Sequence, residues 1–276
     1  MKSAIDKQPD GTIKLDISIS AKDIAATKEL VVEEYVKNMQ LPGFRKGKAP
    51  KKTVEDKIDQ EKLREEILRK LLPKYYIEAV TDHKLNPILN PKIHIHKING
   101  ENEDWQFEAI TCEAPEIDLG DYKENIKKIT AKSKIIIPGK EQQQVSFDDI
   151  VKELLASVKI TIPQIILDQE VDRLLAQSLD EIKKLGLTLE QYLGSTGKTA
   201  ADLRKDYEVK AASDVKLEFA LQKIADEEKI VIEEKEVEEA INQAKSDAEK
   251  QNLQTNRYLL SGILRQQKTL DFLRNL

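Results

Sequence analysis

The sequence predicts an α+β N-terminal domain, a small antiparallel sheet with helices, followed by an elongated all-α domain. Three observations lead to this fold class. Segments before residue 115 alternate between apolar and polar side chains, as half-buried strands do, whereas the chain after residue 146 has a helical period almost throughout. Charged residues make up 34% of the chain, which suits an extended helical body better than one compact globule. The length of 276 residues is enough for two domains.

The first elements expected are a strand over residues 12–20 and a helix over residues 21–39. In the strand, apolar residues face one way and Lys14, Asp16 and Ser18 the other. The apolar strand positions are Ile13, Leu15, Ile17 and Ile19, and the candidate core contacts of the helix are Ile24, Leu30, Val31 and Tyr35. One face of each element should therefore contribute to the first core.

A long amphipathic helix is expected over residues 60–84, and Pro87 and Pro91 then break the pattern. Residues 92–98 and 104–112 alternate again, with the turn-like INGENE between them, which predicts a hairpin. The helix places on one stripe Leu63, Ile67, Leu68, Leu71 and Leu72. These elements complete the α+β domain, with helices against one face of the sheet.

The later helices have sequence signals at their ends. Ser146 begins a helix ending near Val158, and Pro163 lies in the first turn of the next, which Gly186 stops. Thr188 and Gln191 form a capping-box pattern for a short helix. Thr199 starts a helix that runs to about residue 228, and two more are expected near 233–250 and 254–274.

Composition limits the classes of function. The net charge is −5, so nothing draws the whole chain toward nucleic acid. Residues 1–115 are neutral overall, and the remainder is acidic. Cys112 is the single cysteine, which excludes an intrachain disulfide. The first residues have no apolar stretch typical of a secretory signal, and no apolar run is long enough to span a membrane. The expected location is the cytoplasm.

A short segment, LPGFRKGKAP over residues 41–50, departs from this background. Phe44 lies among glycines, prolines and cations, and residues 42–54 contain five cations and no anion. An aromatic ring in such a turn should be exposed. By itself a basic loop with one aromatic residue is usually ordinary surface.

Three other motifs favour structural explanations. GSTGKT at 194–199 lacks the first glycine of a phosphate-binding loop and follows a helix, so it predicts a turn between helices. His94 and His96 share one face of a strand but have no evident third ligand, which favours a polar sheet face and no metal site. The acidic run at 233–240 is typical of a solvated helix face.

The pattern Gly43-Phe44-Arg45-x-Gly47-Lys48-x-Pro50 resembles the ribosome-docking signature of bacterial trigger factor. The order of strand, helix, basic loop, long helix and hairpin is similar to that family's N-terminal domain. Residues 158–177 and 188–240 resemble its helical chaperone domain. The resemblance therefore covers most of the chain, in two blocks.

The resemblance implies an ATP-independent chaperone that docks at the ribosomal tunnel exit and shields nascent or unfolded polypeptides. It implies that residues 1–115 bind the ribosome and that residues 146–276 form the chaperone domain. The implied partners are a ribosomal protein and ribosomal RNA of the large subunit, with unfolded chains as clients; a weak homodimer is left open. No cofactor and no catalytic residue is implied. The implied ribosome-binding residues are Gly43, Phe44, Arg45, Lys46, Gly47 and Lys48.

The family usually carries a prolyl-isomerase domain of the FK506-binding type between the two blocks. Here residues 116–145 are expected to form only a linker, which indicates a form without the isomerase, natural or engineered. Two alternatives remain. One is a prolyl isomerase, as family membership suggests. The other is a periplasmic holdase, which would need a signal peptide and would lack the Gly-Phe-Arg loop.

Overall fold

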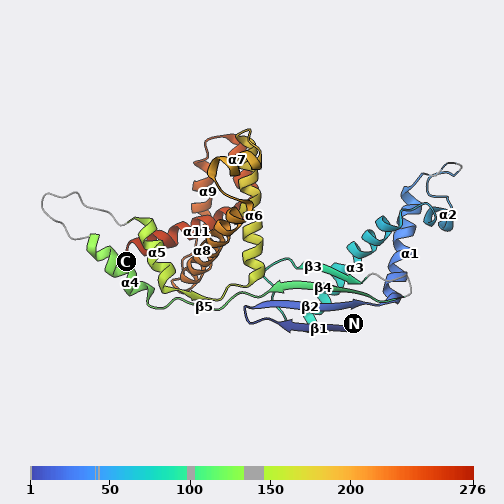
Figure 1. The fold of residues 1–276 in the computed structure, drawn as a ribbon, viewed down its shortest axis with the longest axis horizontal. Helices are drawn as coiled ribbons and strands as arrows, with labels where there is room; N and C mark the ends of the chain where they lie inside the picture. Colours follow the sequence, from blue (N-terminus) through green and yellow to red (C-terminus); the bar gives the residue numbers. More distant parts are fainter. Residues whose placement is uncertain (1, 41, 43, 98–102, 134–145) are drawn as a thin grey trace. The chain divides into compact units, whose positions relative to one another are not determined.

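The computed structural model describes residues 2–40, 42, 44–97, 103–133 and 146–276 (Figure 1). The chain divides into two compact units, here called the first unit (Met1–Ala114) and the second unit (Pro115–Leu276). This division lies one residue before the expected end of the first domain. Each unit has its own hydrophobic core.

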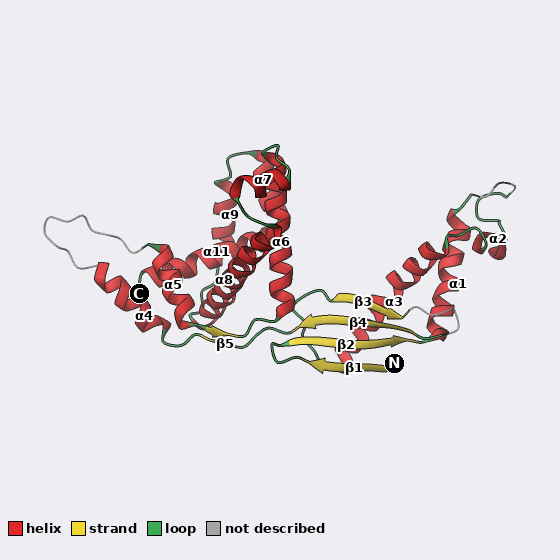
Figure 2. Ribbon diagram, viewed as in Figure 1, coloured by secondary structure: helices red, strands yellow, loops and turns green. Residues whose placement is uncertain are grey.

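The first unit contains a four-stranded antiparallel sheet in the order β1-β2-β4-β3 (Figure 2). β2 (Thr12–Ile19) and β4 (Trp105–Cys112) are central, and β3 (Lys92–Lys97) pairs with β4 as the predicted hairpin. Residues 98–102 of the expected turn lie outside the described residues. The alternation in the sequence therefore predicted these three of the four strands correctly.

The edge strand β1 (Lys2–Lys7) was not expected from the sequence. Its segment, KSAIDK, has Ile5 as its single large apolar residue, so it shows no clear alternation. Pairing with β2 through a tight turn recruits it, and Gly11 supplies the positive φ of 90° in that turn. Strand formation here depends on the neighbour rather than on the segment itself.

The core of the first unit lies between the sheet and two helices. The four predicted β2 side chains are at most 2% exposed, and each such burial contributes about 1.5–3 kcal/mol relative to an exposed side chain. From α1 (Ala21–Asn38), Ile24 and Val31 are buried and Tyr35 packs against the core. Leu30 is 57% exposed, contrary to expectation, because Val31 and Val32 occupy the buried side of that turn.

The long helix α3 (Gln60–Asp82) confirms the amphipathic pattern. Four of its five predicted stripe residues are buried, and Leu72 is partly buried against the same core. Asp59 caps the helix by accepting a hydrogen bond from the backbone N–H of Glu61. The short helix α2 (Lys51–Glu55) lies between α1 and α3 in the chain.

The second unit is mostly helical, as predicted. α8 (Ala200–Glu227) is its longest helix and packs against α6 (Gln164–Lys184), α5 (Phe147–Ser157) and α11 (Arg257–Arg274). The shorter helices are α4 (Tyr122–Ser133), α7 (Leu189–Thr196), α9 (Glu234–Asn242) and α10 (Asp247–Thr255). A two-stranded sheet joins β5 (Ile117–Asp118) to β6 (Lys159–Ile160).

The predicted helix ends are mostly confirmed. The side chains of Ser146, Thr188 and Thr199 each accept a hydrogen bond from a backbone N–H of the first turn. Thr188 completes its capping box with Gln191. Pro163 is the N-cap of α6 and so lies just outside the first turn in which it was expected. The helix expected over 233–250 is interrupted at Gln243 and continues as α10 from Asp247.

The segment expected to be a linker, residues 116–145, differs most from expectation. Within it the structure has the strand β5 and the helix α4. Leu119, Tyr122 and Ile126 are buried with α5, α8 and α11 in the main core of the second unit. Tyr122 and Ile126 lie one helical turn apart, so they share one apolar face of α4. The many lysines elsewhere in the segment make its overall composition polar, which is why a linker was expected from the sequence. Residues 134–145 lie outside the described residues.

Candidate functional site

The basic loop connects α1 to α2 in the first unit. Gly47 has a φ of 78°, a backbone conformation that side-chain-bearing residues rarely adopt. The backbone N–H of Lys48 donates to the carbonyl of Arg45 at 2.9 Å, which closes a tight turn around Lys46 and Gly47. Gly43, one of the predicted docking residues, lies outside the described residues, as does Leu41.

Phe44 and the cations beside it are exposed, as the sequence predicted. The Phe44 side chain is 40% exposed, and Arg45, Lys46 and Lys48 are exposed too. Within the described part of the chain, these three cations have no carboxylate within ion-pair distance. The loop therefore presents one aromatic ring and three uncompensated positive charges to solvent.

The base of the loop is held firmly by the core. Ala49 is 7% exposed, and Val54 and Ile58 are buried in the main core of the first unit. Ion pairs join this base to α1: Lys51 to Glu33, and Lys28 to Glu55 at 2.6 Å. The base of the loop is therefore fixed to the core and to α1, whereas Phe44 and the three cations at its tip are exposed.

The five cations counted in the sequence do not play one role. Lys51 donates a hydrogen bond to Glu33, which raises the pKa of the Lys51 ammonium and lowers that of the Glu33 carboxyl. Its charge is already compensated by α1. The structure thus separates an anchoring lysine from the cations at the tip, a distinction that needed tertiary structure because Glu33 lies 18 residues earlier.

An exposed ring flanked by cations suits a particular kind of binding. Lysine and arginine bind phosphates or carboxylates, and release of counterions from a polyanion favours the contact. An aromatic side chain supplies apolar area that can fill a small cleft on a partner. The arrangement is chemically suited to reversible docking on a mixed surface of nucleic acid and protein.

A second exposed surface lies on α11, and sequence analysis did not single it out. Tyr258, Leu259 and Ile263, here called the α11 patch, are 95%, 63% and 52% exposed. They line a groove of about 560 Å³ together with Leu221 and Ala225 of α8. The signal was present in YLLSGIL at 258–264, which has more apolar residues than one buried helix face can hold.

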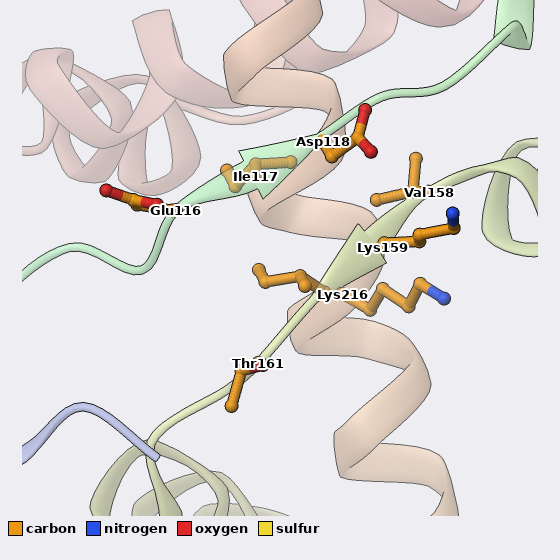
Figure 3. Close-up of a pocket in the computed structure, with 8 residues that line it drawn as sticks. Glu116, Ile117, Asp118, Val158, Lys159, Thr161 and Lys216 are labelled. Atoms are coloured by element: carbon orange, nitrogen blue, oxygen red, sulfur yellow. The ribbon is translucent and has the colours of Figure 1, made fainter. Parts of the chain in front are cut away.

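A pocket in the second unit lies beside the β5–β6 sheet (Figure 3). Glu116 and Asp118 come from the β5 segment, Lys159 from β6, and Lys216 from α8 behind the strands. The remaining lining residues are Ile117, Val158, Ile160 and Thr161. The lining thus consists of charged groups of both signs, aliphatic side chains and one threonine. It does not have the aromatic character of an FK506-binding-type isomerase pocket.

The phosphate-loop-like motif has the structural role expected for it. α7 ends at Thr196, Gly197 takes the left-handed conformation of a helix C-cap, and Thr199 caps α8. Lys198 pairs with Asp206 at 2.6 Å. The acidic run is also a helix face: in α9, Glu236 accepts hydrogen bonds from Lys268 while Val237 and Ile241 are buried.

No helix among the described residues is both long and apolar enough to cross a membrane.

Two family models match this chain. The family model for bacterial trigger factor protein matches residues 1–154, and the model for the trigger factor C-terminus matches residues 119–275. The two matched regions overlap, so no separate isomerase region lies between them.

Individual relatives give the same result. The trigger factor of Natranaerobius thermophilus is 32% identical over 123 residues, which are 45% of this chain and 27% of the relative. That of Pelotomaculum thermopropionicum is 31% identical over 155 residues, 56% of this chain and 33% of the relative. The chain thus aligns with about a quarter to a third of the length of these relatives.

A solved structure also shares the fold. It comes from work on promiscuous substrate recognition in folding and assembly activities of the trigger factor chaperone, and it matches with a TM-score of 0.63 at 14% identity. The match covers 100% of this chain and 99% of that chain. Since the N-terminal family model alone spans more than half of the sequence, the chain belongs to the bacterial trigger factor family.

Proposed function

We propose that this protein is an ATP-independent chaperone that docks at the ribosomal tunnel exit through its first unit and shields nascent or unfolded polypeptides with its second. The observation that carries the proposal is the loop tip: Phe44, Arg45, Lys46 and Lys48 are exposed and uncompensated on a base anchored in the core. Such a tip contributes little to the fold, which favours a role in binding.

The chemistry of the tip fits the tunnel exit. Ribosomal RNA supplies phosphates for Arg45, Lys46 and Lys48, and a ribosomal protein can supply a cleft for the Phe44 ring. One aromatic anchor with few charges gives weak, reversible docking, as a chaperone that must leave each nascent chain requires. Ribosomes that synthesise polypeptides are cytoplasmic in bacteria, so we place the protein there.

The second unit offers apolar surface for clients. The α11 patch is one such area, and other exposed apolar side chains of this unit include Leu185, Val209 and Val231. Separate small patches bind an unfolded chain weakly at each point, so release needs no nucleotide. Membership of the trigger factor family supports this assignment.

The docking proposal is tested by replacing Phe44, Arg45 and Lys46 together with alanine. Truncating such anchors costs about 2 kcal/mol or more at an interface, so co-sedimentation with ribosomes should fall by more than about tenfold. The melting temperature should hardly change, because substitutions on an exposed turn each alter stability by about 0.5 kcal/mol or less. A control variant replaces two cations and one large apolar residue that are exposed on α3, Lys62, Arg64 and Ile77, with alanine, and it should pellet like the wild type.

If the loop variant pellets as well as the wild type at matched salt, the loop is ordinary surface. Pelleting of the wild type with ribosomes would also exclude the periplasmic holdase, because such a chaperone would hold clients without binding ribosomes.

We further propose that the protein is not a prolyl isomerase, although its family often is. The two family matches overlap at residues 119–154, and residues 117–133 are part of the helical core. Proline-limited refolding of a model protein should therefore not accelerate at catalytic amounts of the protein. Acceleration of refolding at catalytic amounts would reveal an isomerase site. Acceleration at stoichiometric amounts alone would indicate that the protein holds the unfolded chain without isomerising its prolyl bonds.

A further inference from the structure

Three strands of the first unit bring potential metal ligands together on the sheet face that the helices leave open. Asp16 comes from β2, Glu108 from β4 and His96 from β3, and one ligand atom of each lies within 4.8 Å of the others. Asp16 and His96 are exposed and Glu108 is half-buried. The three residues lie far apart in the sequence, so only the strand pairing unites them.

The two carboxylates are forced together by the core. Burial of Leu15 and Ile17 in β2, and of Phe107 and Ala109 in β4, turns Asp16 and Glu108 to the opposite face. The register then pairs Asp16 directly with Glu108. Like charges directly opposite each other destabilise a strand pair, so this position favours a bound cation.

The imidazole reaches the pair through an irregularity in β3. The register shifts between Ile95 and Lys97, which leaves His96 as the extra residue, and such bulges re-aim a side chain. Lys14 and Lys92 lie opposite Ile110 in the strand register, and among the described residues neither forms an ion pair with Asp16 or Glu108. Within the described ranges, none of the three clustered side chains forms a hydrogen bond or ion pair with another group.

We propose that Asp16, Glu108 and His96 form a binding site for a divalent transition-metal ion, with Zn²⁺ as the best match. Imidazole and carboxylate groups bind zinc at about 2.0–2.2 Å, which sets ligand atoms about 3.3 Å apart around a tetrahedral ion. Exposed Asp16 and His96 can rotate inward by the small amount required. The imidazole selects against Mg²⁺ and Ca²⁺, which prefer oxygen ligands.

The ion would connect β2, β4 and β3 and stabilise the sheet that carries the loop. His94 faces the same side, opposite Glu108, but is not among the three converging ligands, so water takes the fourth position. The site revises the expectation that His94 and His96 belong merely to a polar face. It is independent of the proposed chaperone function, because none of its residues lies in the loop or the second unit.

Isothermal titration of the full, tag-free chain with Zn²⁺ tests the proposal. The wild type should bind one Zn²⁺ with a Kd of about 10 µM or tighter. Excess Zn²⁺ at about 100 times Kd should raise the melting temperature by several degrees through mass action. His96→Ala and the double variant Asp16→Asn/Glu108→Gln should each bind at least about tenfold more weakly. The control His83→Gln, at the C-cap of α3, should bind like the wild type.

The double variant removes the like-charge pair, so it should fold at least as stably as the wild type without zinc. Weaker zinc binding by this variant would therefore not be explained by misfolding. Absence of stoichiometric binding at about 100 µM Zn²⁺, or unchanged affinity in either site variant, overturns the proposal.

Discussion

Phe44, Arg45 and Lys46 are expected to act through different physics, although they occupy one turn. Removing Arg45 or Lys46 removes a contact that releases counterions, so each alanine variant should flatten the dependence of log K on log salt by somewhat less than one unit per contact. Phe44→Ala should weaken binding and leave that slope nearly unchanged. Ribosome pelleting across a salt series measures both. Equal slopes for all three variants would contradict the assignment of roles.

Lys51 is the matched control for these experiments. It lies three residues beyond the tip but pairs with Glu33 of α1. Lys51→Ala should therefore leave the salt slope unchanged. If it flattens the slope as Lys46→Ala does, the tip and the base of the loop are not functionally distinct.

Asp23, at the start of α1, gives a prediction about pH. Hydrogen bonds from Tyr75 and Ser20 lower the pKa of its carboxyl below the ordinary value of 3.8. A carboxyl whose pKa is lower in the folded state stabilises the fold above its unfolded pKa, and this contribution is lost as the pH falls through the folded pKa. Tyr75→Phe removes the largest cause, so the Asp23 pKa should rise toward 3.8.

Carbon-detected NMR titration of the Asp23 carboxyl measures this shift. Tyr76→Phe is the control, because the buried Tyr76 hydroxyl has no hydrogen-bond partner in the described part of the protein. That variant should leave the Asp23 pKa unchanged and be neutral or slightly stabilising. An unshifted Asp23 in Tyr75→Phe would show that the tyrosine does not set its pKa.

At the scale of elements, signals local to the sequence were sufficient for most of the fold. Alternation predicted β2, β3 and β4, and side-chain caps predicted the starts of α5, α7 and α8. β1 and α4 were missed for a common reason. Each has few apolar residues of its own, and each forms because a neighbouring element supplies the rest of the interface.

The turn before α4 tests whether this missed segment is part of the fold. Gly120 has a φ of 54°, and a Cβ there would lie 2.7 Å from the backbone carbonyl oxygen of Ser157. Gly120→Ala should therefore destabilise the second unit by more than about 1 kcal/mol, since both the backbone conformation and the contact oppose it. Urea unfolding monitored by circular dichroism measures the change. A neutral effect would mean that residues 117–133 are not held against α5.

Gly194 supplies the opposite expectation. It lies in α7, has no atom within 4 Å of the added Cβ, and does not need a positive φ. Gly194→Ala should stabilise the helix by up to about 1 kcal/mol. The two glycine variants together separate the effect of backbone strain from the general effect of adding a methyl group.

At the scale of the whole molecule, the division into two units was predictable, but the surfaces were only partly so. The exposure of the basic loop was predictable because its glycines, aromatic residue and cations are contiguous in the sequence; its role in docking stays a prediction. The α11 patch and the Asp16–Glu108–His96 cluster were not recognised. The first requires knowing which side of α11 is covered, and the second requires the register of three strands. The strand register carries no local sequence signal, whereas the apolar excess of YLLSGIL was visible in the sequence but did not say which side of α11 is covered.

The division also predicts which part of the chain can hold clients alone. The sequence suggested residues 146–276 as the chaperone domain, but Leu119, Tyr122 and Ile126 belong to its main core. A fragment that begins at residue 146 loses these side chains and uncovers Ile150, Leu154 and Ile224. Losing three large apolar side chains from one core costs several kcal/mol, comparable with the total stability of a domain.

Fragment 115–276 should therefore unfold cooperatively and slow the aggregation of an unfolded client, because it retains both its core and the α11 patch. Fragment 146–276 should melt at a much lower temperature or without a cooperative transition. Replacing Tyr258, Leu259 and Ile263 with serine in fragment 115–276 should reduce protection without lowering its melting temperature, since all three are exposed. Circular dichroism melts and light scattering of a denatured client measure the two properties separately. If only fragments that contain residues 1–114 protect the client, the client surface lies in the first unit and the proposed division of roles is wrong.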